Sequence, residues 1–210
     1  MKKFFTALAL TLLIPVAATA ANWQEGKHYT VIQGQPTKTK EVREYFSFYC
    51  PACRGFESIL PDIKANLPKG VKFKKTHVDF MGHTDQATQF MITKAYLVAE
   101  KSKLGNEFSA AMFNYLQTER KQVSSLDDLK AIYVKVGGDA AKFDKGFNNF
   151  MVVKTAEKEK KVQDRLSKAR HVKSVPTFVV NGKYAINAKA LSNDNFIEEY
   201  KALINYLAQK

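Results

Sequence analysis

The chain has 210 residues, of which 45% are hydrophobic and 25% are charged. This length and composition favour a globular protein with one sizeable core, or a core with an inserted domain. The 33 basic and 20 acidic residues give a net charge of +13. No nucleic-acid recognition motif accompanies this excess, and the lysines are scattered along predicted helix faces. Nucleic acid is therefore excluded as an expected partner.

The N-terminus has the features of a secretory signal peptide. Met1–Lys3 is basic, residues 4–16 form an apolar run, and Ala18-Thr19-Ala20 is a small-residue cleavage site. The run is too short and wrongly flanked for a membrane anchor. We therefore expect removal of residues 1–20 and export of a soluble protein with a net charge of +11. Export would place the cysteines in an oxidising compartment.

Strand and helix signals alternate in the first part of the mature chain. Residues 28–32 and 41–49 are predicted strands, and the second is rich in aromatic side chains, as a buried central strand would be. Residues 71–80 alternate apolar and polar side chains, which predicts a third strand. Between them, apolar residues at helical spacing predict a helix, and Pro61 inside it should kink it. These apolar residues are Phe56, Ile59, Leu60, Ile63 and Leu67.

Helices dominate the middle of the chain. Helical spacing predicts helices over residues 84–101, 108–116, 126–136, 139–147 and 148–171. The third is opened by a cap at Ser124 or Ser125. Strand signal returns over 177–180 and 183–186, joined by a two-residue hairpin turn at Asn181-Gly182. A C-terminal amphipathic helix is predicted over 193–209.

The predicted order of elements is β-β-α-β, a helical block, then β-β-α. This order favours an α/β fold, in which a strand–helix–strand unit and a strand–strand–helix unit share one sheet with a helical insertion between them. We place the signal peptide at residues 1–20, the two parts of the sheet domain at 21–82 and 168–210, and the helical insertion at 83–167.

The only two cysteines form one motif, Cys50-Pro51-Ala52-Cys53. A disulfide between them would close a very small loop, which makes it a poor structural staple but suits a labile, catalytic bond. The motif lies where the predicted central strand ends and the first long helix begins. Unpaired N–H groups at a helix start stabilise an anion, so the pKa of Cys50 should be lowered. Pro51 suits the first helical turn, where its missing N–H has no cost.

Four stretches of the chain occur in an order known from one protein family. They are Phe46–Cys53, His77–Gly82, Val175-Pro176 and Val180–Tyr184. Together they resemble the DsbA family of bacterial periplasmic thiol:disulfide interchange proteins, and the resemblance covers essentially the whole mature chain. It implies a thioredoxin fold with an inserted helical domain. It also implies a periplasmic dithiol oxidase without a cofactor, whose partners are unfolded exported proteins with cysteine pairs and a membrane reoxidase of the DsbB type.

The resemblance assigns roles around the motif. Cys50 would be the sulfur that substrate attacks, and Cys53 the more buried resolving sulfur. A His commonly occupies the position of Ala52 in the family and helps to stabilise the thiolate. We therefore expect Cys50 to be less acidic here and the protein to be a somewhat weaker oxidant. Val175-Pro176 resembles the cis-proline element that presents its backbone to an extended substrate, the alternative being a trans proline that starts the next strand.

Three charged residues also match family positions. One acid matches Glu44, a second acid matches Glu57, and a Lys matches Lys75. A carboxylate among the apolar residues of a central strand is costly unless it is paired. Two roles for Glu44 follow. It is either a buried group that accepts a proton when Cys53 must become nucleophilic, or an edge-facing group in a salt bridge with Lys75.

Other functions stay open on the sequence alone. Within redox enzymes the alternative is a disulfide isomerase or reductase, although we see no separate dimerisation segment before Cys50 and expect a monomer. A peptide-binding chaperone with incidental cysteines is a second alternative. A dedicated partner for one acidic substrate, suggested by the basic charge, is a third. No zinc site is expected, because no pair of the four histidines has ligand spacing. They are His28, His77, His83 and His171.

Overall fold

The computed structural model describes residues 22–210, so the predicted signal peptide lies outside the described residues. Their centre is a five-stranded sheet with strand order β1-β5-β4-β2-β3. β2 and β3 are parallel, and the other neighbours are antiparallel. The α/β class is confirmed; the predicted central strand, β2, is an interior strand between β4 and β3, while β4 holds the middle position. The strands are β1 (Tyr29–Val31), β2 (Glu41–Phe46), β3 (Lys72–His77), β4 (Thr177–Val180) and β5 (Tyr184–Ile186).

β2 and β3 are shorter than predicted. β2 ends at Phe46 rather than Tyr49 because the chain turns at Ser47. The Ser47 carbonyl accepts a hydrogen bond from the N–H of Cys50 at 3.1 Å, and the Ser47 hydroxyl accepts one from the N–H of Tyr49 at 3.2 Å. β3 ends at His77 rather than at residue 80. The turn at Ser47 places the cysteine motif immediately after the central strand.

The helix that follows the cysteines is broken rather than kinked. α1 (Pro51–Phe56) and α2 (Leu60–Ala65) are separate helices. Pro61 has no N–H to donate to the carbonyl of Glu57, so the α-helical ladder cannot continue through this point. Pro61 instead lies in the first turn of α2, where a proline is well tolerated.

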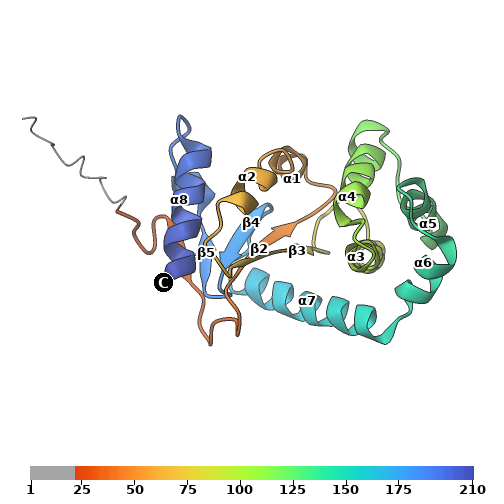
Figure 1. Cartoon of the computed structure of the whole chain (residues 1–210), viewed down its shortest axis with the longest axis horizontal. Helices are drawn as coiled ribbons and strands as arrows, with labels where there is room; N and C mark the ends of the chain where they lie inside the picture. The colour runs from red at the N-terminus through yellow and green to blue at the C-terminus, as the bar shows by residue number, and fades with distance from the viewer. Residues whose placement is uncertain (1–21) are drawn as a thin grey trace, which may run out of the picture.

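Helices cover both faces of the sheet (Figure 1). α8 (Phe196–Gln209) and α2 pack on the face that carries Val42 and Phe178. α7 (Phe150–Lys168) covers the other face, where Leu166 packs with Tyr45 and Val179. Successive residues of a strand point to opposite faces, which is why Val42 and Tyr45 belong to different cores.

The chain between β3 and β4 is helical, as predicted. Side chains stabilise several of the helix starts: Ser125 and Asp128 form a capping box on α5, so Ser125 is the N-cap, and Asp139 caps α6. No helix within residues 22–210 is long and apolar enough to cross a membrane. The remaining elements are α3 (Gln86–Lys101), α4 (Gly105–Phe113), the π-helix η1 (Asn114–Thr118), α5 (Leu126–Lys135), α6 (Ala140–Phe147) and the 3-10 helix η2 (Ala188–Ala190).

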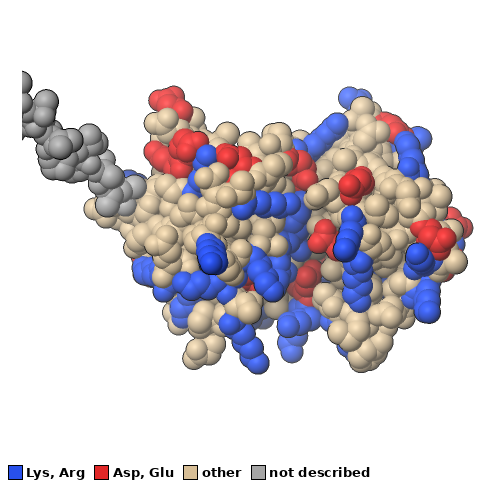
Figure 2. All heavy atoms as spheres, in the orientation of Figure 1, with Lys and Arg blue, Asp and Glu red and all other residues tan. Residues whose placement is uncertain are grey.

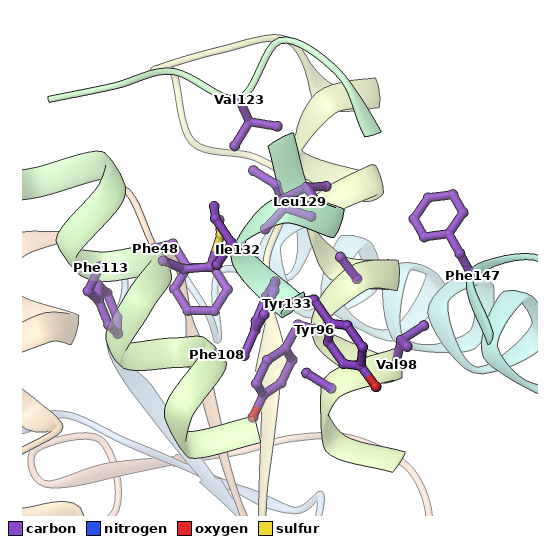
Figure 3. Packing of buried hydrophobic residues seen from close by; sticks show 14 of the residues in the cluster. Phe48, Tyr96, Val98, Phe108, Phe113, Val123, Leu129, Ile132, Tyr133 and Phe147 are labelled. Atoms are coloured by element: carbon purple, nitrogen blue, oxygen red, sulfur yellow. The ribbon is translucent and has the colours of Figure 1, made fainter. Parts of the chain in front are cut away.

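The helical segment and the sheet share an apolar core. Phe46 at the end of β2 and Phe48 in the following turn are buried together with Phe108 and Phe113 of α4. The ring centroids of Phe48 and Phe113 are 5.1 Å apart, edge to face, and Figure 3 shows both rings among the helices. α7 belongs to both parts as well, because Leu166 packs on the sheet. The predicted domain boundary after residue 167 therefore falls at the end of α7, the helix that connects the helical segment to the sheet.

The hairpin between β4 and β5 differs from the prediction by one residue. Asn181 and Gly182 have φ angles of 53° and 63°. Such angles are the reason that Asn-Gly is favoured at the centre of hairpin turns. The N–H of Lys183 donates to the carbonyl of Val180 at 2.9 Å. The paired strand residues are Val180 and Tyr184, so three residues rather than two lie between them.

Candidate active site

Cys50 lies at the start of α1, directly after the central strand. It is the N-cap of the helix, and its Sγ accepts a hydrogen bond from the backbone N–H of Cys53 at 3.2 Å. Pro51 occupies the first helical turn. The two thiols are free, and Cys50 is 6% exposed while Cys53 is fully buried. The sulfur of Cys50 is therefore the one that a substrate can reach.

The two thiols differ in acidity. The pKa of Cys50 is lowered from 9.0 to about 6, chiefly because the Cys53 thiol donates a hydrogen bond to its sulfur. The backbone N–H groups of Cys53 and Ala52 lower this pKa further, while burial opposes them. The pKa of Cys53 is raised, first by burial and then by its hydrogen bond to Cys50. At neutral pH the negative charge therefore lies on Cys50, and Cys53 keeps its proton.

The loop before β4 faces Cys50. The Val175–Pro176 peptide bond is cis, so the trans alternative is wrong. In its protonated form, the Cys50 thiol donates to the Val175 carbonyl at 3.3 Å. Thr177 at the start of β4 pairs with Tyr45 near the end of β2. This antiparallel pairing brings the loop and the cysteines to the same end of the sheet.

Three charged side chains from three elements form a connected group: Glu44 on β2, Lys75 on β3 and Glu57 at the end of α1. The register of β2 and β3 places Glu44 opposite Lys75. The two form an ion pair with 3.5 Å between Nζ and Oε2, and Lys75 also forms a salt bridge with Glu57. Glu44 is fully buried on the central strand. The edge-facing alternative is therefore wrong, although the ion pair with Lys75 is present.

Burial dominates the chemistry of Glu44. It raises the pKa of this carboxyl from 4.5 to about 7, against the opposing effect of the Lys75 charge. The charge of Glu44 in turn contributes to the raised pKa of Cys53. A carboxyl that titrates near neutral pH, within electrostatic reach of a thiol, is able to exchange a proton with its surroundings as that thiol ionises.

Comparison with known proteins assigns these features to a family. The model of the DSBA-like thioredoxin domain matches residues 41–200. The chain belongs to the DsbA family. It is 36% identical to the thiol:disulfide interchange protein DsbA of Haemophilus influenzae and 32% identical to that of Escherichia coli K12, in each case over 100% of both chains.

Solved DsbA structures resemble this one. Proteus mirabilis DsbA, in complex with a non-covalently bound peptide, is 26% identical, has a TM-score of 0.79, and the match covers 90% of this chain and 100% of the other. Pseudomonas aeruginosa DsbA is 27% identical with a TM-score of 0.75, covering 90% and 95%. The expected thioredoxin fold is confirmed, and the chain is a thiol:disulfide oxidoreductase.

Two residues support the site in this DsbA family member, but the sequence alone did not predict a role for them there. Gln117 of the π-helix donates from Nε2 to the carbonyl of Phe48 at 2.8 Å. His77 is buried, stacks on Phe48 with ring centroids 5.1 Å apart, and burial lowers its pKa to about 3, so it is neutral. The strand pattern places His77 in the sheet. Nothing near Gln117 indicates its partner, which lies 69 residues earlier.

A stacked pair lies immediately before the motif. The rings of Tyr49 and His83 have centroids 5.6 Å apart and an interplanar angle of 15°. No zinc-like arrangement joins these groups to the cysteines: within residues 22–210, no three His, Cys, Asp or Glu side chains are grouped to hold a metal ion. The chemistry available at this site is that of two thiols and a buried carboxyl.

Proposed function

We propose that this DsbA family member is the oxidising donor that passes its Cys50–Cys53 disulfide to newly exported proteins. One observation carries the proposal: the Cys50 sulfur accepts a hydrogen bond from the backbone N–H of Cys53 at 3.2 Å, and the neighbouring Cys53 thiol also lowers the pKa of Cys50. These donors stabilise the Cys50 thiolate, and hence the reduced protein. A disulfide whose reduced form is stabilised is a good acceptor of electrons.

The reaction takes place in two exchanges. A substrate thiolate attacks the Cys50 sulfur, the Cys50–Cys53 bond breaks, and its electron pair goes to Cys53, which takes up a proton because its pKa is raised. A second substrate thiolate then attacks the substrate sulfur of the mixed disulfide, and Cys50 leaves as a stable thiolate. The substrate loses two electrons and gains a disulfide, and the enzyme is left as a dithiol.

We assign proton transfer to and from Cys53 to Glu44. Its pKa of about 7 lets it hold or release a proton at neutral pH, and Lys75 and Glu57 fix its surroundings. Because Cys53 is fully buried, it has little access to solvent protons. Glu44 would supply the proton during substrate oxidation and accept it during reoxidation.

Partners and location are further parts of the proposal. The Proteus mirabilis relative has a peptide bound non-covalently, which supports the binding of an extended client in this protein, with the Val175 backbone as its strand partner. The N-terminal segment 1–20 supports export to the periplasm. Reoxidation requires an acceptor for two electrons, and a DsbB-type membrane partner acting on a monomer fills that role.

The stabilisation of the thiolate has a calculable effect on the redox equilibrium. A thiol pKa of about 6 instead of 9.0 stabilises the dithiol at pH 7 by about 1.4 kcal/mol, which corresponds to about 30 mV for a two-electron couple. Equilibration with glutathione measures the potential. We expect a value more positive than about −180 mV.

Two results would overturn the proposal. A potential near about −270 mV, where thioredoxin lies, would indicate a reductase. Retention of full client-protecting activity by Cys50→Ser would indicate a chaperone, since that variant has no Cys50–Cys53 disulfide to pass to a client. The oxidase loses all activity on a dithiol peptide in the same variant.

A further inference from the structure

A groove separate from the cysteines lies between α7 and the sheet. It has a volume of about 720 Å³, and residues 35–39 form part of its lining. β2, β3 and β4 provide its sheet side, and none of Cys50, Cys53 and Val175 lines it. Its volume is in the range of specific ligand sites in proteins.

Part of the floor of the groove is apolar. Tyr45 and Val179 of the sheet and Leu166 of α7 line it and are almost fully buried, and Val162 is half-buried beside them. Such a floor can accept apolar side chains without leaving polar groups unsatisfied. A highly charged ion with no apolar part would leave this surface unused.

The carboxylates of the groove are already paired. Glu41 contacts Arg43 at 3.0 Å and Lys74 at 2.6 Å. Glu159 contacts Arg43 at 3.1 Å, and the same guanidinium donates to the hydroxyl of Thr76 at 2.8 Å. These pairs account for both acids that line the groove, so they leave no negative charge to attract a cation.

Three further cations at the rim have no such partner. Lys38, Lys158 and Arg165 are exposed and line the groove. Among the described residues, none of them has a carboxylate within salt-bridge distance. Figure 2 shows Lys and Arg side chains gathered over the part of the molecule where Figure 1 places the sheet and α7. The groove is therefore positively charged above an apolar floor.

We propose that this groove binds an extended peptide segment that carries both acidic and apolar side chains. Unpaired cations select the acidic side chains, and the floor takes the apolar ones. The assignment of this peptide to an unfolded client rests on the proposed oxidase function, which supplies such chains. A client held here while its cysteine reacts at Cys50 gains effective concentration at the redox site.

The direct test measures binding without any cysteine chemistry. A dye-labelled peptide in which Glu alternates with Val is titrated with the wild-type protein in its oxidised form, and fluorescence anisotropy reports binding. We expect binding that weakens as salt is added, and no comparable binding of the matched peptide in which Gln replaces Glu. Amide resonances of Gln35 and of residues 37–39 and 155–166 should shift on titration, which locates the peptide without any variant.

A pair of matched variants assigns the charges. The double variant Lys158→Gln/Arg165→Gln should bind the acidic peptide about tenfold more weakly, equivalent to about 1.4 kcal/mol. The control, Lys142→Gln/Lys145→Gln, removes the same charge from exposed, unpaired positions on α6 and should bind like wild type. Thermal melts establish that both variants are folded.

Three outcomes would overturn the proposal that the groove binds an acidic and apolar peptide. They are equal binding of the acidic peptide by both double variants, equal binding of the Gln peptide by the wild type, and resonance shifts confined to the region of Cys50. Full displacement of the peptide by an equal concentration of inorganic phosphate would also overturn it, because the groove would then bind simple anions rather than a peptide. Oxidation of an uncharged dithiol peptide by the wild type is measured alongside. If the wild type does not oxidise this peptide, the proposed function fails. If it oxidises this peptide but the acidic peptide does not bind in the groove, only the groove proposal fails.

Discussion

Cys50 and Cys53 are three residues apart yet have opposite chemistry. The sulfur of Cys50 receives hydrogen bonds from the first turn of α1, whereas Cys53 is enclosed by the core. Burial penalises a charged thiolate, and donors favour it. The difference between the two sulfurs therefore arises from where each lies on one helical turn, and it makes Cys50 the better leaving group.

Replacement of Ala52 should make Cys50 more acidic. In Ala52→His, a protonated imidazole beside the sulfur adds a positive charge, and we expect it to lower the pKa of Cys50 by about one pH unit and to make the potential about 30 mV more oxidising. Titration of thiolate absorbance measures the pKa. Ala52→Gln, which adds bulk without charge, should leave it unchanged, and an unchanged or raised pKa in the His variant would contradict the expectation.

Glu44 should make the stability of the oxidised protein depend on pH. Its pKa is about 7 in the folded protein and 4.5 when unperturbed. The folded state thus binds the proton more tightly, so stability is highest below pH 4.5 and falls as the pH rises through 7. The loss is on the order of 3 kcal/mol. In Glu44→Gln this loss should vanish.

Urea unfolding of the oxidised protein at pH 5 and pH 8 measures the effect, because the disulfide removes the thiols from the titration. Glu107→Gln, an exposed position on α4, is the control and should lose stability with pH as the wild type does. The same loss in Glu44→Gln would show that another group is responsible.

The π-helix η1 connects the helical segment to the turn before the cysteines. Gln117 donates to the carbonyl of Phe48, which is buried in the shared core. In Gln117→Ala that carbonyl loses its partner, and we expect a loss of about 1–2 kcal/mol in the free energy of unfolding. Urea unfolding tests this against Gln122→Ala, an exposed position that should change stability by less than about 0.5 kcal/mol.

The presence of elements with a local signal was predictable, whereas their exact ends and the long-range contacts were not. The helices of the middle segment follow from apolar spacing and caps such as Ser125 and Asp139. The end of β2 depends on hydrogen bonds around Ser47, and the break after α1 on the missing N–H of Pro61. The sequence pattern of a strand does not show where its hydrogen-bonded pairing with the neighbouring strand ends, so the predicted strands were too long.

The same distinction applies to the site. The cysteine motif and its place between strand and helix are visible in the sequence. The pairing of Glu44 with Lys75 requires the register of two strands, and the contact between Gln117 and Phe48 requires the packed helical segment. Family resemblance supplied the first pair, whereas neither spacing nor composition points to the second.

At the scale of the molecule, β2 connects three regions with different chemistry. One of its faces carries the buried Glu44, the other carries Arg43 and Tyr45 into the groove, and its end leads to Cys50. Because β2 lies between β3 and β4, it is held on both sides. The redox site is thus built at the end of an interior strand of the sheet.

The central claim is that the folded protein stabilises the Cys50 thiolate. The most direct measurement is the thiolate absorbance of the reduced wild-type protein as a function of pH, with Cys50→Ser as the reference that contains only Cys53. We predict a transition with a midpoint near pH 6 that is absent from the reference. A midpoint near the ordinary thiol value of 9.0 would contradict the account.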